Sequence, residues 1–268
     1  MRLMKRSSSK TVDGTRQVRG PGAPITLHGR PGDRYFERAT PKGQSESRLQ
    51  WLLAHGVRAD GVVLDVGANV GLTAVMIARA CRGPVYAFEP HPETFGFLSA
   101  TLIANRADNV TPFNLGLGAA PGTLPFFVDP DSSASHVVTP HTRGRQGAIA
   151  VEITTIDDIA LPMEAGVSFI KLDAEGSEPD IIAGGRATIL RDRPALFVEF
   201  NLFTLMAISN INPRQMLTDL LELFRYVYRF SEDKPYPIDS EAAVIDFLHD
   251  AITRQAASTD LFCTFDPL

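Results

Sequence analysis

A glycine turn that follows a short apolar run is the first candidate for chemistry in this sequence. The run at residues 62–66 reads VVLDV and continues as GANVG, so Asp65, Gly67, Asn69 and Gly71 follow one another closely. Glycine allows a sharp turn and lets a ligand approach the backbone, and a helix that begins after the turn presents free N–H groups. The pattern indicates a site for a nucleotide-type cofactor. The alternative is a tight turn that binds nothing.

Glu89 is placed to complete this site. It ends the next apolar run, 22 residues after Gly67. The lengths of the intervening helix and strand bring it beside the turn, where a carboxylate can accept both hydroxyls of a ribose. A dinucleotide fold would need Gly-x-Gly-x-x-Gly, whereas Asn69 stands at the middle position. Asp65 lies inside the strand end, which suits a cofactor with a positively charged group and no pyrophosphate, so S-adenosylmethionine is favoured.

A second ionisable segment, KLDAEGSE at residues 171–178, ends a later apolar run. Acidic groups between a strand and the following helix lie where open α/β sheets bind ligands. Asp65 and Asp173 therefore flank one crevice if the strand order reverses between the two runs. Glu175 and Glu178 share one face of a helix. The alternative for these acids is capping of the helix N-terminus, and Glu178 fits that alternative well.

Glu199 and Asn201 lie at the end of another apolar run, which begins at residue 195. The alternation of side chains along a strand places both residues on the same side. A carboxylate in a buried strand costs several kcal/mol unless it is paired or used. Glu199 is therefore a functional candidate, with an ion pair to Lys171 or Arg193 as the alternative.

Short apolar runs alternate with helical spacing along most of the chain, which predicts a mostly parallel, doubly wound α/β sheet. The expected strands are residues 62–66, 85–88, 110–118, 167–172, 195–200, 226–230 and 261–265. The expected helices are residues 44–55, 71–81, 92–105, 178–190, 216–224 and 240–254.

The remaining segments define the expected domain organisation. Residues 1–33 are rich in Gly, Pro, Ser and Arg, and they are expected to form a flexible basic tail before a single domain at 34–268. Residues 120–156 interrupt the alternation with a β excursion around a long polar loop at 129–147. Residues 201–213 have no clear period. Both regions are candidate lids over a site.

The composition excludes several classes of protein. The chain has 268 residues, 44% of them hydrophobic, and no apolar run reaches the ~18 uncharged residues of a membrane-spanning helix. Its net charge is −5 although its first 20 residues are basic, so the rest of the chain is acidic. An acidic body argues against the binding of nucleic acid and suits a cationic ligand. Cys81 and Cys263 form neither a disulfide framework nor a zinc motif. They are expected to be buried thiols of a cytoplasmic protein.

Five stretches between residues 61 and 201 carry a resemblance to a known family. They are VVLDVGANVGLTA, AFEPHP, ITTIDDI, FIKLDAEGSEPDIIAGG and RPALFVEFN, and they resemble the FkbM family of S-adenosylmethionine-dependent methyltransferases. The resemblance implies a Rossmann-like class I methyltransferase fold. Its seven-stranded, mostly parallel sheet would have the order 3-2-1-4-5-7-6, with the seventh strand antiparallel and helices on both faces. It also implies O-methylation of a hydroxyl on a sugar, a polyketide or another secondary metabolite.

Site residues follow from the motif positions and from the chemistry. The resemblance implies that the cofactor is held by Asp65, Gly67, Ala68, Asn69, Gly71, Glu89 and Pro90, with Asp173 and Glu199 facing the methyl group. A base would speed methyl transfer to a hydroxyl by about 10²–10⁴; Asp173 is the first candidate and His91, just past Glu89, the second. The expected catalytic residues are Asp173, Glu199 and His91, and the expected substrate-side residues are Lys171, Glu175, Glu178 and Asn201.

Several alternatives stay open at this point. A metal ion is not favoured, but its ligands would be Asp173, Glu199 and Asn201. The chain could instead be a nicotinamide-dependent oxidoreductase, which would bind NAD(P)H. It could also be a non-catalytic methyltransferase-like module that acts through a partner. The favoured function predicts a hydroxyl-bearing small molecule or glycan as substrate.

Overall fold

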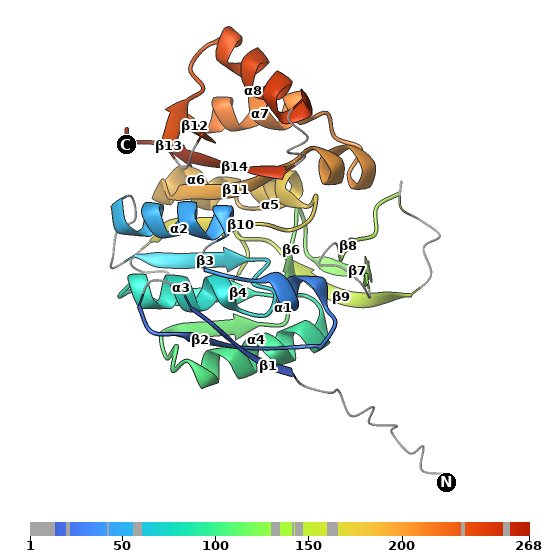
Figure 1. Ribbon diagram of the computed structural model, residues 1–268. Coiled ribbons are helices and arrows are strands. Elements are labelled where there is room, and N and C mark those ends of the chain that lie inside the picture. The colour runs from blue at the N-terminus through green and yellow to red at the C-terminus, as the bar shows by residue number, and fades with distance from the viewer. Residues whose placement is uncertain are drawn as a thin grey trace.

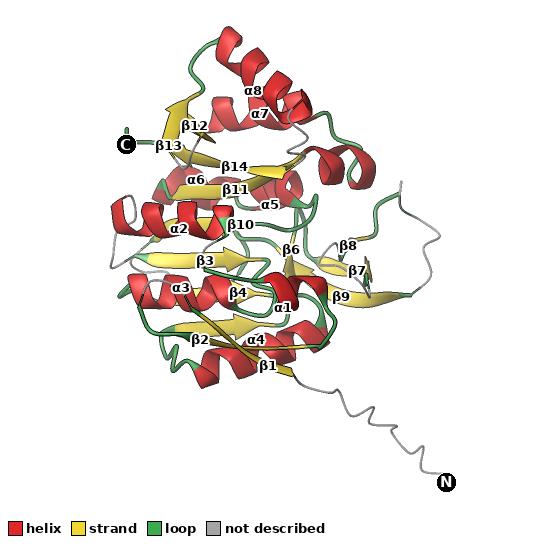
Figure 2. Cartoon of the chain, viewed as in Figure 1, coloured by secondary structure: helices red, strands yellow, loops and turns green. Residues whose placement is uncertain are grey.

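An eight-stranded sheet runs through the middle of the molecule (Figures 1 and 2). The computed structural model describes residues 14–19, 22–41, 43–55, 61–129, 135–140, 142, 147–159, 166–231, 234–253 and 258–268. The strands are, in order across the sheet, β13 (Lys234–Pro237), β12 (Tyr226–Ser231), β14 (Ser258–Thr264), β11 (Ala195–Asn201), β10 (Val167–Leu172), β3 (Val62–Val66), β4 (Val85–Phe88) and β5 (Val110–Phe113). The five strands from β11 to β5 are parallel, and β14 is antiparallel to both of its neighbours.

The α/β fold is confirmed, but within the described residues the sheet has eight strands where seven were expected. The additional strand, β13, reads KPYP and pairs with β12 at the edge of the sheet. Proline cannot donate to a ladder and is confined largely to edge strands, which is why the composition of this segment gave no strand signal. The other seven strands lie in the order β5-β4-β3-β10-β11-β14-β12.

Helices cover both faces of the sheet, and each face has its own hydrophobic core. Because side chains alternate along a strand, Val63 of β3 packs into one core and Leu64 into the other. The first core contains residues of α2 (Gln44–His55), α3 (Leu72–Ala80) and α4 (Pro92–Ala104). The second contains residues of α5 (Glu178–Gly184), α6 (Arg186–Asp192), α7 (Pro213–Leu223) and α8 (Glu241–Thr253). Within the described residues, no helix is long and apolar enough to cross a membrane.

An N-terminal hairpin replaces part of the flexible tail expected at residues 1–33. Strands β1 (Gly14–Val18) and β2 (Ile25–Gly29) pair antiparallel, and β2 packs on α4. The Asn105 amide bonds both the N–H and the C=O of Thr26, at 3.0 and 2.7 Å, and the His28 N–H donates to Thr101 at 2.9 Å. These contacts order the segment through residues far along the chain, so the expectation of irregular backbone was wrong here. Residues 1–13 lie outside the described residues.

The β excursion expected at 120–156 forms a second, smaller sheet beside the first. Its strands are, in spatial order, β6 (Gly116–Leu117), β9 (Ala148–Thr154), β7 (Gly122–Phe127) and β8 (His136–Val137). Phe126, Val151 and Ile153 form its small core. Most of the predicted loop 129–147 lies outside the described residues, so its role as a lid stays a prediction.

The second candidate lid, residues 201–213, contains a short π-helix, η1 (Thr204–Ile208). The hydroxyl of Ser209 bonds the Gly176 carbonyl, and that of Thr139 bonds the Ile208 carbonyl at 2.6 Å. The segment therefore connects the turn after β10 with the loop after β8. Its closure over a substrate stays a prediction.

Candidate active site

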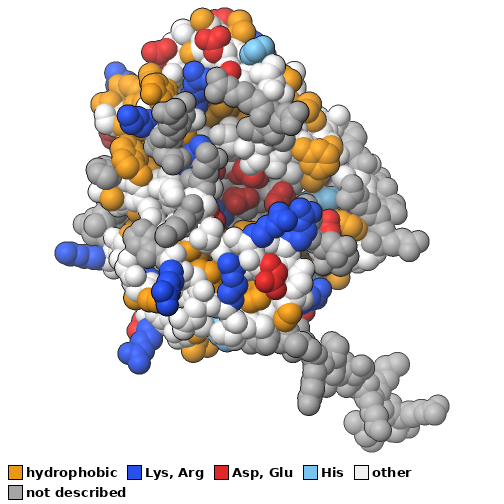
Figure 3. Space-filling view, viewed as in Figure 1, with side chains coloured by type: hydrophobic (Ala, Val, Ile, Leu, Met, Phe, Trp, Pro, Cys, Tyr) orange, Lys and Arg blue, Asp and Glu red, His pale blue; other side chains and the backbone are white. Residues whose placement is uncertain are grey.

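A cavity of about 450 Å³ lies at the carboxyl ends of β3, β4, β10 and β11. Its volume falls in the range of small-molecule sites, and its position is where open α/β sheets bind ligands. Figure 3 shows acidic side chains at the bottom of a hollow, with basic side chains near its rim. The small sheet closes one side through Phe126, Val128 and Ile153.

The glycine turn forms one wall of this cavity, although packing explains its glycines. Gly67 and Gly71 have positive φ angles of 74° and 92°, and Asn69 between them has a φ of 49°. A Cβ on Gly67 would lie 1.7 Å from the Asp173 carbonyl oxygen, and one on Gly71 would lie 2.8 Å from a methyl carbon of Leu98. These glycines allow the turn to pack closely against neighbouring segments. The sequence had instead suggested that they allow a ligand to approach the backbone.

The predicted cofactor residues of this turn differ in their access to the cavity. Gly67 and Asn69 line it. Ala68 is buried, and neither Ala68 nor Gly71 is among the lining residues. The motif implied that Ala68 and Gly71 contact the cofactor directly. This geometry does not provide such contacts, because neither residue lines the cavity. Pro90, after the next strand, does line the cavity.

Glu89 presents a carboxylate that two backbone amides hold in place. The Asn69 N–H donates to Oε2 at 3.1 Å and the His91 N–H donates to Oε1 at 2.9 Å. Burial raises the pKa of Glu89 to about 7, against the lowering effect of these two amides. Each carboxylate oxygen can accept a further hydrogen bond, so the group can receive a pair of hydroxyls from the cavity.

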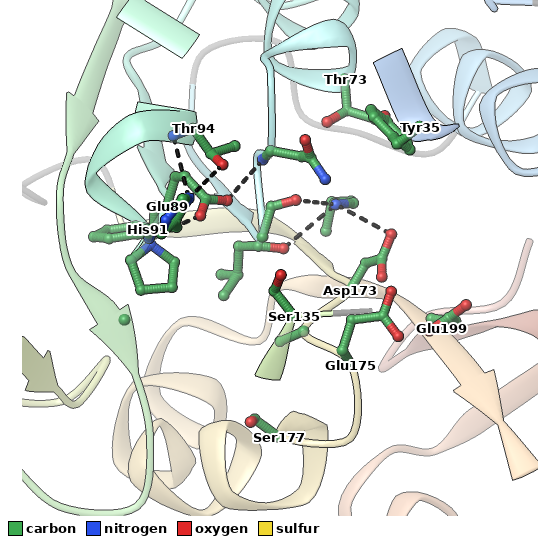
Figure 4. A pocket seen from close by; sticks show the side chains of 18 of the residues that line it. Tyr35, Thr73, Glu89, His91, Thr94, Ser135, Asp173, Glu175, Ser177 and Glu199 are labelled. Atoms are coloured by element: carbon green, nitrogen blue, oxygen red, sulfur yellow. Dashed lines mark hydrogen bonds and ion pairs between the residues drawn. The ribbon is translucent and has the colours of Figure 1, made fainter. Parts of the chain in front are cut away.

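His91 lies at the Glu89 end of the cavity (Figure 4). Its Nδ1 caps α4, 2.8 Å from the Thr94 hydroxyl oxygen, and burial lowers its pKa. Figure 4 draws it across the cavity from Asp173, Glu175 and Glu199. This position argues against the expected role of His91 as the base. His91 instead lines the same end of the cavity as Glu89.

Asp65 lies behind the cavity wall. It is completely buried, accepts a hydrogen bond from Thr73 at 2.9 Å, and lies 3.5 Å from the Lys171 ammonium. Burial raises the pKa of Asp65 more than Lys171 and Thr73 lower it. The structure therefore gives Asp65 a role in supporting the cavity wall, in place of the expected direct contact with the cofactor.

Lys171 connects the two strand ends that form the site. Its ammonium lies 3.6 Å from Asp173, 3.5 Å from Asp65 and 2.9 Å from the Gly67 carbonyl oxygen. Burial lowers the pKa of Lys171, but the Asp173 and Asp65 carboxylates together raise it above its usual value. The two carboxylates thus favour the ionised form of Lys171. Lys171 does not fully offset the cost of burying the Asp65 charge, because its one ammonium serves two carboxylates.

Asp173, Glu175 and Glu199 form a carboxylate cluster at the opposite end of the cavity from Glu89 (Figure 4). One oxygen from each lies within 4.8 Å of the others. Burial, followed by repulsion from Asp173 and Glu178, raises the pKa of Glu175 to about 8. Burial and repulsion from Asp173 and Glu175 also raise the pKa of Glu199 well above its usual range. The structure thus brings together three of the residues that the sequence singled out.

Glu178 and Asn201, which were expected on the substrate side, are not among the residues that line the cavity. The Glu178 carboxylate is buried and accepts the N–H groups of Ala174 and Gly176 at 2.8 and 2.9 Å. The Asn201 side-chain oxygen accepts the N–H of Phe203 at 3.0 Å. Both side chains satisfy local backbone groups, the role that residues of these types take at helix starts and turns.

Parts of the cavity wall come from segments in which the sequence showed no site motif. Arg30, Asp33 and Tyr35 line it near α1 (Arg34–Arg38), Ser45, Glu46 and Arg48 line it from α2, and Ser258, Thr259 and Asp260 line it from β14. A buried ion pair between Arg48 and Asp260, at 2.9 Å, joins α2 to β14. No local pattern marks these residues, because only the folded chain brings them to one place.

The sheet order, with β14 antiparallel and the cavity at the carboxyl ends of the parallel strands, defines a class I methyltransferase fold. A solved structure of this fold, the T. thermophilus 16S rRNA N2 G1207 methyltransferase RsmC, aligns with a TM-score of 0.50 at 18% identity, covering 95% of this chain and 51% of that one. Residues 65–231 match the profile of the methyltransferase FkbM domain. The chain belongs to the FkbM methyltransferase family, as its motifs predicted.

Two curated relatives show which proteins this chain is similar to. The hexuronic acid methyltransferase AglP of Haloferax volcanii is 29% identical over 135 residues, which are 50% of this chain and 53% of AglP. The 2-O-methyltransferase NoeI of Sinorhizobium fredii is 26% identical over 191 residues, 65% of this chain and 76% of NoeI. The chain therefore spans about half the length of the first relative.

Proposed function

We propose that this protein is an S-adenosylmethionine-dependent methyltransferase that methylates a hydroxyl group of a small molecule or glycan. The observation that carries the proposal is the Glu89 carboxylate, which two amides fix at the cavity wall beside the turn of Gly67 and Asn69. A carboxylate in this position suits the two hydroxyls of a ribose. The acidic lining of the cavity suits a cationic cofactor.

The residues present fit S-adenosylmethionine. Glu89 would bind the ribose hydroxyls, and Pro90 and His91 would line the same end of the cavity. Gly67 and Asn69 would form the wall along the cofactor. Lys171 lines the cavity as well and holds the Gly67 carbonyl oxygen, while Asp65 lies behind the wall and contacts Lys171. When bound, the cofactor supplies an electrophilic methyl group.

The carboxylate cluster would bind the acceptor and take its proton. Asp173 is oriented by Lys171 at 3.6 Å, and Glu175 has a pKa of about 8, which lies near the value that suits a base at neutral pH. The three carboxyl groups lie close together, with one oxygen of each within 4.8 Å of the others. The cluster, with Asp173 as its fixed member, therefore replaces a single base in this proposal.

A sugar hydroxyl is the acceptor that the relatives support. AglP is named for hexuronic acid and NoeI for 2-O-methylation. Carboxylates at the cavity floor can accept hydrogen bonds from several hydroxyls of one sugar.

An acceptor screen tests this proposal. The protein is incubated with S-adenosylmethionine and a panel of sugars and glycans, and S-adenosylhomocysteine is measured together with the mass of each acceptor. We expect one acceptor to gain a methyl group, and Asp173→Asn to reduce turnover by about 10²–10⁴ while binding S-adenosylhomocysteine normally. Undiminished turnover in this variant would remove Asp173 from the proposed role.

A further inference from the structure

Three carboxyl groups, those of Asp173, Glu175 and Glu199, meet at the end of the cavity opposite Glu89, with the Lys171 ammonium beside Asp173. An oxygen of each residue lies within 4.8 Å of the other two, and Figure 4 draws Asp173 and Glu175 side by side with Glu199 next to them. Like charges at this separation repel one another, and the repulsion is stronger in a partly buried site than in water. All three groups can be ionised together only with a compensating positive charge nearby.

Among the described residues, no side chain supplies that charge to the whole cluster. Lys171 contacts Asp173, but it also serves Asp65 and donates to the Gly67 carbonyl oxygen at 2.9 Å. Glu175 and Glu199 make no salt bridge within the described part of the chain. Glu175 and Glu199 therefore have no cation within salt-bridge distance among the residues that the structure describes.

Glu199 provides a second, independent observation. Its Oε1 accepts a hydrogen bond from the Ser258 hydroxyl at 2.6 Å. Its Oε2 is buried, and no donor among the described residues contacts it. A buried carboxylate oxygen without a donor is costly, so this atom is suited to a ligand from outside the chain.

We propose that Asp173, Glu175 and Glu199 bind one divalent cation of the magnesium or manganese class. Three carboxylate oxygens form the hard ligand set that these ions prefer, with water completing the coordination. Ser258 acts as a positioning residue, because it orients Glu199 in the way that outer hydrogen bonds orient metal ligands. Glu175 takes the place that the sequence assigned to Asn201, whose side chain is engaged by the Phe203 N–H.

The ion would serve the acceptor side of the cavity. It would bind an acceptor hydroxyl and lower the pKa of that hydroxyl, so that the proton leaves to water and the cluster serves as the ligand set of the ion in place of a base. This use of the ion rests on the proposed function. Binding of the ion depends only on the three carboxylates and can be measured without cofactor or acceptor.

Titration with Mn²⁺, followed by the loss of its free electron paramagnetic resonance signal, tests the proposal. The full chain is treated with EDTA, dialysed and titrated with MnCl₂, with MgCl₂ as competitor. We expect one Mn²⁺ per chain, displaced by Mg²⁺. Glu175→Gln and Glu199→Gln should each weaken binding by about tenfold or more, and Ser258→Ala by roughly 10- to 100-fold. Glu46→Gln is the matched control, because Glu46 lines the same cavity outside the cluster, and it should bind normally.

Two results would overturn the proposal. One is no Mn²⁺ binding by folded protein, which would mean that the carboxylates share protons and bind no cation. The other is binding that Glu175→Gln and Glu199→Gln leave unchanged, or that Glu46→Gln weakens equally. The same preparation is titrated with S-adenosylhomocysteine without metal. If that ligand binds and Mn²⁺ does not, the metal site is refuted and the proposed function stands.

Discussion

Replacing Lys171 with methionine should destabilise the whole domain, because it would leave a buried carboxylate uncompensated. Lys171 loses its contacts with Asp65 at 3.5 Å and Asp173 at 3.6 Å, and the Gly67 carbonyl loses a donor at 2.9 Å. Asp65 keeps only its hydrogen bond from Thr73, at 2.9 Å. Removing one partner of a buried ion pair costs about 3–5 kcal/mol.

This free-energy cost can be converted to a change in melting temperature. In a domain of this size, each kcal/mol shifts Tm by about 2–4 °C, so Lys171→Met should lower Tm by roughly 6–20 °C. The double variant Asp65→Asn/Lys171→Met should recover part of the loss, with a coupling energy of about 1–3 kcal/mol. Calorimetry and urea unfolding at pH 7 measure both quantities. Arg214→Met is the matched control, because its ion pair with Glu241 is exposed and should contribute less than about 1 kcal/mol.

The reasoning is refuted if Lys171→Met changes stability by no more than Arg214→Met does. It is also refuted if the effects of Asp65→Asn and Lys171→Met simply add, because additive effects would mean that the two side chains do not interact.

Three further predictions concern the turn, the pH dependence and the hairpin. Gly67→Ala should cost about 3 kcal/mol or more, because its Cβ would lie 1.7 Å from the Asp173 carbonyl oxygen at a positive φ; an unchanged Tm would contradict this. Binding of S-adenosylhomocysteine should be about tenfold weaker at pH 6 than at pH 8, because Glu89, with a pKa of about 7, must lose its proton to accept both hydroxyls; calorimetry showing equal affinities would contradict this. Asn105→Ala should remove about 1–3 kcal/mol of local stability and speed amide exchange at residues 25–29, because it deletes both bonds to Thr26; unchanged exchange would show that other contacts hold β2.

The parts of the fold that were predictable are those with strong local patterns. The bounds of β3 and β10 match the predicted runs, because every residue of both strands is buried and therefore apolar or paired. The hairpin at residues 14–29 was missed because its order comes from Asn105 and Thr101, about 75 positions later. The helix expected at 178–190 is two helices that meet at Gly184 and Gly185, where a Cβ on Gly184 would lie 2.0 Å from the Gly118 carbonyl oxygen.

The candidate site was predictable where strand ends carry the chemistry. Strand order alone brings Glu89, Asp173 and Glu199 to one cavity. The sequence could not distinguish acids that face the cavity from acids that accept hydrogen bonds from backbone N–H groups. Glu178 was therefore expected on the substrate side, but it does not line the cavity. That distinction depends on single hydrogen bonds, such as that from the Ala174 N–H. Tyr35 was missed because it reaches the cavity from a segment far from the motifs.

Calorimetric titration with S-adenosylhomocysteine, with NADH titrated in parallel, tests the central claim most directly. We expect micromolar binding of S-adenosylhomocysteine and none of NADH. Glu89→Gln should weaken that binding by roughly 10- to 100-fold, because a hydrogen-bonded carboxylate contributes about 1.5–3 kcal/mol. Binding of NADH, or no binding of S-adenosylhomocysteine by folded protein, would contradict the assignment of this cavity to a methyl donor.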